Sequence, residues 1–256
     1  MKSIIVIPAR LDSKRLPNKL IADINGKPML KWVLESCLKS KLSNSLFLCT
    51  DSNELASIAK DCNVQTFLTS SDCQSGTDRI ASILKRLCNS DPLNKTLIIN
   101  VQGDQPFIDP NLIDKMIREF KNKDYLTEVI TPVYKLNKDS VHNPNVVKTL
   151  LDKSHRAIYF SRSAIPHIRD VPKEKWFERY PYYGHVGIYG YRADILMRWS
   201  SLKNSTLEEL ERLEQLRFID NGIKVDTFMV KGSFLSVDTE DQLTKARIIA
   251  KNMKEV

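Results

Sequence analysis

The fold is decided by the stretch Ile4-Ile5-Val6-Ile7-Pro8-Ala9-Arg10-Leu11-Asp12-Ser13-Lys14-Arg15-Leu16-Pro17-Asn18-Lys19. Its first half is an apolar run rich in β-branched residues, which is typical of a strand buried on both faces of a sheet. Its second half is a loop with four cations, Arg10, Lys14, Arg15 and Lys19. Ligands of α/β sheets bind outside the carboxyl ends of the strands, so this loop suits a polyanion such as a triphosphate. A solvated turn is the alternative interpretation of a basic loop taken alone.

Length and composition indicate one α/β domain or one domain with an insertion. The chain has 256 residues, of which 42% are apolar, and this is enough for a full core. No stretch approaches the roughly 18 apolar residues that a membrane span needs, and the N-terminus opens as a strand without a signal-peptide pattern. Five cysteines without a C-x-x-C motif favour reduced thiols over zinc or disulfides. We therefore expect a cytoplasmic protein with no membrane partner.

The charge balance points to an anionic ligand. The net charge of +8 favours anionic partners in general. The sequence contains no nucleic-acid-binding motif, such as a zinc finger or a long basic helix. Several cations lie instead in loops beside strands, which suits a small anion, and a non-catalytic RNA-binding module stays the alternative from another class.

Hydrophobic periodicity predicts alternating strands and helices in the first 125 residues. Strands are expected over residues 4–9, 46–49, 64–68 and 97–101, with helical spacing over 30–38, 55–59, 80–87 and 112–120. This β-α-β-α-β alternation predicts a mainly parallel sheet with helices on its faces. Asp51 follows the second strand, where capping of the next helix is the favoured interpretation.

Two carboxylates are expected at the ends of extended segments. Asp104 follows the strand at 97–101 through a glycine turn, and Asp238 follows the extended run at 234–237. Mg²⁺ typically binds one or two carboxylates together with substrate phosphates. The stretch Gln74–Arg79 is a small turn that feeds a helix N-terminus, whose free N–H groups suit a base edge or a phosphate.

The pattern changes between residues 126 and 200, where short strand-like runs alternate with polar segments rich in Pro, Asn and Lys. We expect an inserted β-rich subdomain that completes a substrate pocket, a dimer face or both. Alternation over 185–191 predicts one strand with His185, Gly187, Tyr189 and Tyr191 on a single face. Leucine spacing predicts one helix from about 206 to 222, with Glu214 and Gln215 off its apolar stripe.

Six short segments then carry a family resemblance, because all of them occur in one order along the chain. They are Pro8-Ala9-Arg10-x-x-Ser13-x-Arg15-Leu16-Pro17-x-Lys19, Gln74-Ser75-Gly76-Thr77-Asp78-Arg79, Asn100-Val101-Gln102-Gly103-Asp104-x-Pro106, His185-x-Gly187-Ile188-Tyr189-Gly190-Tyr191, Leu213-Glu214-Gln215-Leu216-Arg217 and Val237-Asp238-Thr239. Together they resemble the 3-deoxy-manno-octulosonate (Kdo) cytidylyltransferases over nearly the whole chain.

The resemblance implies a Rossmann-like nucleotide-diphospho-sugar transferase fold of three layers, in one domain with a sugar-binding and dimer-forming insertion at 126–200. It implies transfer of CMP from CTP to the anomeric hydroxyl of Kdo, with release of pyrophosphate, for lipopolysaccharide assembly. By the same resemblance the CTP-binding residues are Arg10, Arg15, Lys19, Ser75, Gly76, Arg79 and Asp104. The implied Mg²⁺ ligands are Asp104 and Asp238, and the implied sugar-binding residues are Gln102, Arg162, His185, Tyr189, Glu214 and Gln215. The implied catalytic residues are Arg10, Arg15, Lys19, Asp104 and Asp238.

Two positions depart from the family pattern. Gln105 stands where the family usually has Glu, and Glu240 stands where it often has Pro. The loss of a carboxylate at 105 leaves the reaction class intact but leaves the exact sugar acid open. 8-Amino-Kdo and sialic acid are the alternative substrates.

Overall fold

The computed structural model describes residues 1–13, 15–123, 126–232 and 234–254. Its strands form a ten-stranded sheet in the order β3-β2-β1-β4-β9-β5-β8-β6-β7, with β10 beside β5. The strands are β1 (Lys2–Ala9), β2 (Ser45–Thr50), β3 (Gln65–Leu68), β4 (Thr96–Asn100), β5 (Val129–Lys135), β6 (Lys148–Leu151), β7 (Ala157–Ser161), β8 (Tyr183–His185), β9 (Tyr189–Arg192) and β10 (Val225–Val230).

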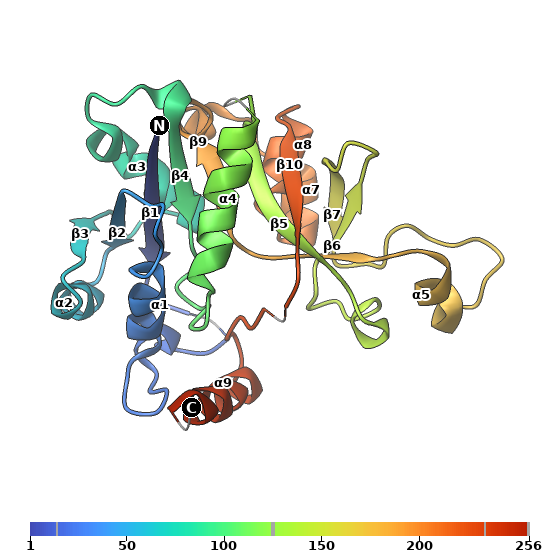
Figure 1. Cartoon of the computed structure of the whole chain (residues 1–256), viewed down its shortest axis with the longest axis horizontal. Helices are drawn as coiled ribbons and strands as arrows, with labels where there is room; N and C mark the ends of the chain where they lie inside the picture. The colour runs from blue at the N-terminus through green and yellow to red at the C-terminus, as the bar shows by residue number, and fades with distance from the viewer. Residues whose placement is uncertain (14, 124–125, 233, 255–256) are drawn as a thin grey trace.

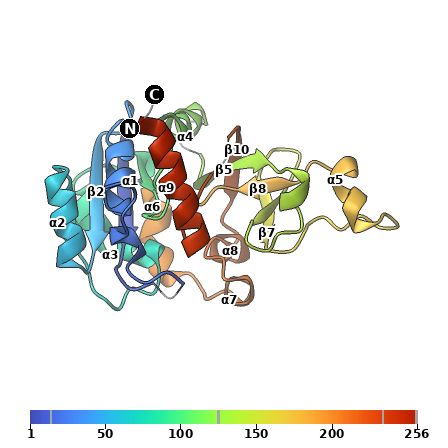
Figure 2. The same cartoon turned by 90° about the horizontal axis from the view of Figure 1, so that it is seen from below.

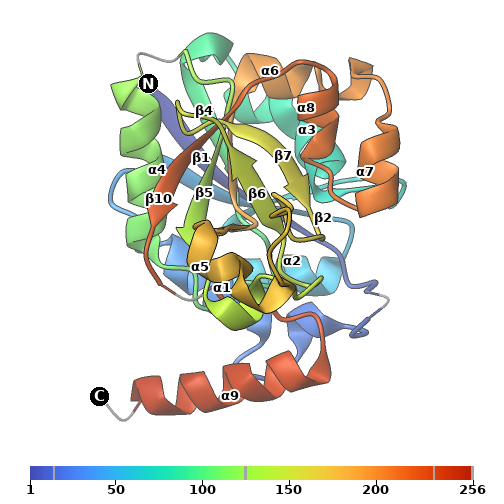
Figure 3. The same cartoon turned by 90° about the vertical axis from the view of Figure 1, so that its right-hand side faces the viewer.

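The helices cover both faces of this sheet, which confirms the predicted three-layer α/β fold (Figure 3). They are α1 (Met29–Cys37), α2 (Asn53–Asp61), α3 (Gly76–Cys88), α4 (Pro110–Asn122), α5 (Trp176–Arg179), α6 (Ala193–Met197), α7 (Thr206–Glu211), α8 (Leu216–Asp220) and α9 (Glu240–Lys254). Short 3-10 turns include η1 (Lys19–Ile21). No helix in the described part of the chain is long and apolar enough to cross a membrane.

Strand β1 is the centre of the sheet and pairs in parallel with β2 and β4. Its residues from Ile4 to Ile7 are fully buried and alternate between the two faces. Ile5 and Ile7 join the core beneath α1, α2, α4 and α9, whereas Ile4 and Val6 join the core beneath α3, α6 and α8. The continuous apolar run at the N-terminus is therefore explained by burial on both faces.

The sheet is mixed beyond β4, because β9 pairs antiparallel with both β4 and β5, whereas β10 pairs in parallel with β5. Strands β6, β7 and β8 extend it through the predicted β-rich segment. A projecting arm that carries α5 leaves this end of the sheet (Figures 1 and 2). A small separate core holds the arm together around Leu136, Val141, Trp176 and Tyr182.

The single strand predicted over 185–191 is wrong. Residues 186–188 separate two strands, β8 and β9, and both strands pair with β5. The hydroxyl of Thr131 donates to the carbonyls of Val186 and Ile188. His185 and Tyr189, which the alternation places on one face, are still neighbours, with ring centroids 5.1 Å apart.

The single helix predicted over 206–222 is also wrong, because α7 and α8 are separate. The break lies at Arg212, whose φ of 54° is left-handed. Leu213 and Leu216 are buried as the leucine spacing predicts, but Leu210 is 77% exposed. The break places Glu214 and Gln215 in the turn between the helices, and this placement brings Glu214 to the site described next.

Candidate active site

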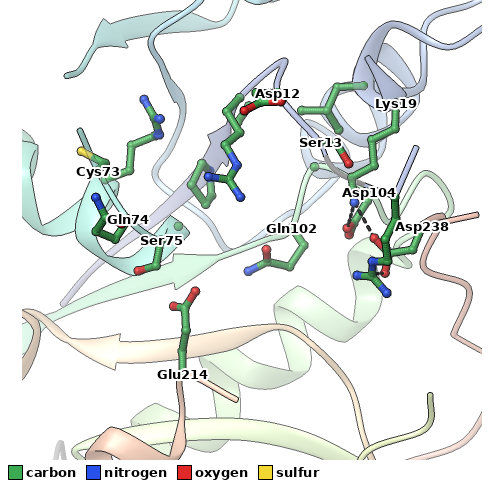
Figure 4. Close-up of a pocket in the computed structure, with 18 residues that line it drawn as sticks. Asp12, Ser13, Lys19, Cys73, Gln74, Ser75, Gln102, Asp104, Glu214 and Asp238 are labelled. Atoms are coloured by element: carbon green, nitrogen blue, oxygen red, sulfur yellow. Dashed lines mark hydrogen bonds and ion pairs between the residues drawn. The ribbon is translucent and has the colours of Figure 1, made fainter. Parts of the chain in front are cut away.

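A pocket of about 420 Å³ lies at the carboxyl ends of β1 and β4, beside the N-terminus of α3. Predicted site residues line it from five separate segments: Arg10, Arg15, Lys19, Ser75, Gly76, Arg79, Gln102, Asp104, Glu214 and Asp238. Figure 4 shows the turn before α3 on one side, Asp104 and Asp238 (the acidic pair) on the other, and Gln102 between them. The loop after β1 therefore lines the pocket. Lys14 lies outside the described residues.

The acidic pair and Lys19 form one cluster. The ammonium of Lys19 lies 2.6 Å from Asp104 and 2.7 Å from Asp238. Arg15 contacts the other carboxylate oxygen of Asp238 at 2.9 Å. Burial by itself lowers the pKa of Lys19, but the charges and hydrogen bonds of Asp104 and Asp238 outweigh burial and raise that pKa above its ordinary value. Lys19 therefore stays protonated in this pocket.

The backbone fixes where the two carboxylates stand. The N–H of Val237 donates to the carbonyl of Asp104 at 2.9 Å. The side chain of Gln242 accepts from the backbone N–H groups of Asp238 and Thr239 at 2.8 and 3.1 Å. Two close carboxylates fit the donor set that Mg²⁺ takes from proteins beside substrate phosphates. No cluster of three or more metal-ligating side chains occurs among the residues that the structure describes.

The turn before α3 packs closely against β1 and the 214 turn. Ser75 is the N-cap of α3 and accepts from the N–H of Asp78. A Cβ at Gly76 would lie 3.0 Å from the ring of Pro8, so glycine permits this close approach. Thr77 donates to Glu214 at 2.8 Å. Burial is the largest influence on Glu214 and raises the pKa of its carboxyl group.

Arg79 lines the pocket, and its side chain is only 3% exposed. Its guanidinium contacts Asp51 at 2.8 Å and also donates to the hydroxyl of Thr69. The capping role predicted for Asp51 is wrong, because Ser52 caps α2 by accepting from Leu55. Asp51 instead fixes Arg79, and the sequence gives no signal for this pairing of residues 28 positions apart.

Three predicted sugar-binding residues lie outside the pocket lining and carry buried polar atoms, and we call them the buried group around His185. The Nε2 of His185, the hydroxyl of Tyr189 and the Nε2 of Gln215 are buried, with no hydrogen-bond partner among the described residues. Burial lowers the pKa of His185 to about 3. Burial, and then the charges of Tyr191 and Glu214, raise the pKa of Tyr189 well above its ordinary value. Buried polar atoms without partners are costly, and a polar ligand would satisfy them.

Arg162 does not line the pocket. Its guanidinium donates to the backbone carbonyls of Glu211 and Pro144 at 2.8 and 3.2 Å, and Glu211 accepts from its backbone N–H. In this structure Arg162 therefore ties β7 to the end of α7.

The two positions that depart from the family pattern lie away from the pocket lining. Gln105 is only 8% exposed, and its amide would touch a Cβ at Gly187 at 3.2 Å. It lines a separate, more apolar hollow with Phe107 and Leu235. Glu240 is exposed on α9 and pairs with Arg247 at 3.3 Å.

The pocket also contains polar residues for which the sequence predicts no individual role, namely Asp12, Ser13, Cys73 and Gln74. Asp12, Ser13 and Gln74 lie within segments that carry the resemblance, and this position is the signal that could have found them. Cys73 directly precedes such a segment.

Comparison with known proteins places this fold and site in a class. A family model described as cytidylyltransferase matches residues 4–225, so the chain is a nucleotidyltransferase of the cytidylyltransferase class. A 3-deoxy-manno-octulosonate cytidylyltransferase of Chloroherpeton thalassium is 40% identical over 99% of this chain and 100% of its own length. One from Francisella tularensis is 40% identical over 95% of this chain and 96% of its own. The chain belongs to the 3-deoxy-manno-octulosonate cytidylyltransferase family.

Solved structures agree with this assignment. A CMP:2-keto-3-deoxy-manno-octonic acid synthetase complexed with CTP is 34% identical, with a TM-score of 0.88 and full coverage of both chains. A cytidylyltransferase from Leptospira borgpetersenii is 17% identical, with a TM-score of 0.62 over 100% of this chain and 96% of its own, and it supports the fold alone. The enzyme interpretation is therefore confirmed over the RNA-binding alternative.

Proposed function

We propose that this protein transfers CMP from CTP to the anomeric hydroxyl of 3-deoxy-manno-octulosonate and releases pyrophosphate. The observation that carries the proposal is the Asp104–Lys19–Asp238 cluster, which faces the turn before α3 across one pocket. A basic loop and an acidic pair at one sheet edge suit a polyphosphate and a divalent cation. The product would enter lipopolysaccharide assembly.

Each part of the pocket has a proposed role. Arg10, Arg15 and Lys19 bind the triphosphate, and Ser75, Gly76 and Arg79 border the cytosine. Asp104 and Asp238 hold Mg²⁺, which when bound offsets the negative charge of the phosphates and of the sugar carboxylate. Gln102, Glu214 and the neighbouring group of His185, Tyr189 and Gln215 bind the sugar acid. Arg162 acts with them only if it leaves its backbone partners.

The chain's own residues do most of their work by charge and position. The nucleophile is part of a carboxylate-bearing sugar, and it must approach an anionic phosphate. Arg10 and Arg15 reduce this repulsion and stabilise the charge that develops on the leaving pyrophosphate. The buried group around His185 holds the sugar in one orientation, which lowers the entropic cost of the reaction.

The test is pyrophosphate release with CTP, Mg²⁺ and Kdo, each omitted in turn and with EDTA as a further arm. Release that needs all three supports the proposal. Release with 8-amino-Kdo or sialic acid but not with Kdo keeps the mechanism and changes the substrate. No release with any of the three sugar acids contradicts the proposed reaction.

We also propose that residues 126–200 form the sugar-binding and dimer-forming part of the single domain. The projecting arm with its own small core supports this, because such an extension offers a surface to a second copy (Figure 2). A cytoplasmic location is supported by five free cysteines, three of them buried, since free thiols persist in reducing compartments. Light scattering of the full chain measures whether it is a dimer. The same measurement on a variant substituted in the arm tests whether the arm forms the dimer.

A further inference from the structure

The charges of the acidic pair are already compensated within the protein. Asp104 and Asp238 both contact the ammonium of Lys19, at 2.6 and 2.7 Å, and Arg15 contacts Asp238 at 2.9 Å. Two carboxylates and two cations give a local sum of zero. The side chains of Lys19, Asp104 and Asp238 are at most 21% exposed, so water screens these charges only in part.

This arrangement sets Lys19 against a divalent cation. The ammonium lies within hydrogen-bond distance of both carboxylates (Figure 4). The same two carboxylates would hold the metal ion. Like charges at such short range repel each other strongly in a partly buried site. The ammonium therefore competes with a metal ion for the pair.

Lys19 is able to leave the pair when another anion is offered. Its charge sits at the end of a flexible four-carbon stem, and the residue begins the short turn η1. The same pocket contains Arg10 and Gly76, and Ser75 lies across from the acidic pair (Figure 4). A triphosphate bound there would bring negative charge within reach of the ammonium.

We infer that Lys19 is the resident counter-ion of Asp104 and Asp238 in the nucleotide-free protein, and that a nucleoside triphosphate frees the pair for a divalent cation by taking the ammonium. Nucleotide binding and metal binding are then coupled, and each strengthens the other. The inference rests on the proposed function for both ligands. We expect the coupling to change metal affinity on the order of tenfold or more.

Direct metal binding tests this inference without measuring turnover. Mn²⁺ is titrated into nucleotide-free wild type and Lys19→Met, and the free Mn²⁺ is measured by electron paramagnetic resonance. Methionine keeps an unbranched side chain only one atom shorter and removes the charge. We expect Lys19→Met to bind Mn²⁺ at least about tenfold more tightly than the wild type. Lys2→Met is the matched control, because Lys2 pairs with the remote Asp91 at 2.6 Å.

Thermal stability provides a second readout and a check on folding. Removal of the ammonium leaves Asp104 and Asp238 repelling each other, so Lys19→Met should melt lower than the wild type and recover more stability on addition of Mg²⁺. A second substitution, Asp104→Asn in the same chain, should restore stability without metal, because it removes the repulsion.

The outcomes separate this inference from the proposed function. The control is the wild type with CTP, in which Asp104→Asn should abolish Mn²⁺ binding. If it does, and folded Lys19→Met binds Mn²⁺ no more tightly than the nucleotide-free wild type, the inference is overturned. If Asp104→Asn changes Mn²⁺ binding neither in the wild type with CTP nor in Lys19→Met, the proposed metal site fails, and the inference fails with it.

Discussion

The backbone N–H of Val237 donates a 2.9 Å hydrogen bond to the carbonyl oxygen of Asp104. This bond joins the loop after β4 to the segment before α9, although the two are far apart in the sequence. Main-chain atoms therefore set the spacing between the carboxylates of Asp104 and Asp238. Replacing one carboxylate should leave the other in its place.

The substitutions Asp104→Asn and Asp238→Asn should each lower kcat by on the order of 10²-fold, because each removes charge stabilisation at the reacting phosphate. Both replacements are near-isosteric, so each variant should stay folded, with a melting temperature lowered only by the lost contact with Lys19. Asp241→Asn on the exposed side of α9 is the control and should keep wild-type turnover. Near-normal kcat in either variant would remove that residue from the metal site.

Arg15→Ala should weaken the use of CTP more than the use of the sugar. The Arg15 side chain is 65% exposed, and among the described residues its ion pair is with Asp238, so stability should change by less than about 0.5 kcal/mol. Loss of a triphosphate contact should raise the KM for CTP on the order of tenfold. Arg169→Ala, which is 90% exposed, should leave that KM unchanged. If CTP saturation is the same for Arg15→Ala and the wild type, the triphosphate does not lie at Arg15.

Asp51→Asn should act on the nucleotide through Arg79. The amide cannot neutralise the guanidinium that Asp51 contacts at 2.8 Å. A nearly buried arginine without its charge partner should change its position. We expect a loss of about 1–3 kcal/mol of unfolding free energy and weaker CTP binding. Calorimetric titration of CTP measures the second effect. Asp91→Asn, which breaks the ion pair with Lys2, controls for loss of a carboxylate elsewhere. An unchanged Kd for CTP in Asp51→Asn would argue against the proposed place of Arg79 beside the cytosine.

The first half of the fold follows from local sequence because its signals are local. The run from Ile4 to Ile7 needs burial on both faces of the sheet, and periodic helices after it leave few other arrangements. The strand-end rule then brings Arg10, Lys19 and Asp104 to one edge without knowledge of any side-chain contact.

The second half depends on tertiary contacts that periodicity does not record. Leucine spacing continues through 210–216, yet Arg212 takes a left-handed conformation and turns Glu214 toward Thr77. The first half holds one such contact, the pairing of Asp51 with Arg79, which joins a strand end to a helix. Local sequence does not record it and favours a helix cap instead. The roles of the predicted site residues stay predictions.

Acid should destabilise the protein partly through His185. Burial lowers the pKa of His185 to about 3, whereas an unfolded histidine titrates near about 6.5. Between these values the unfolded chain binds a proton that the folded chain does not, so the free energy of unfolding falls as pH is lowered from about 6.5. The slope from this group is at most about 1.4 kcal/mol per pH unit.

His185→Gln should flatten this part of the stability curve, as measured by urea unfolding at a series of pH values. His155→Asn is the control, because His155 is exposed and has a φ of 59°, which asparagine tolerates. Parallel curves for the wild type and His185→Gln would show that His185 does not carry the acid sensitivity.

Lys148→Met should destabilise the fold without touching the pocket. Lys148 is fully buried, and its ammonium donates to the carbonyls of Asn143 and Val146 at 2.8 and 2.6 Å and to that of Arg162. Burial, assisted by the charge of Arg162, lowers the pKa of Lys148 to about 8, although Glu211 opposes the shift. Three carbonyl bonds use every donor of the ammonium, which ties the turn before β6 to the end of β7.

Methionine fills the same space but leaves those three carbonyl oxygens without their donor. We expect a loss of about 2–4 kcal/mol of unfolding free energy in urea. Lys135→Met, at an exposed position of β5, should change it by less than about 0.5 kcal/mol. Equal effects of the two substitutions would mean that the carbonyls find other donors, and that Lys148 is not what holds β6 and β7 to the turn between 143 and 146.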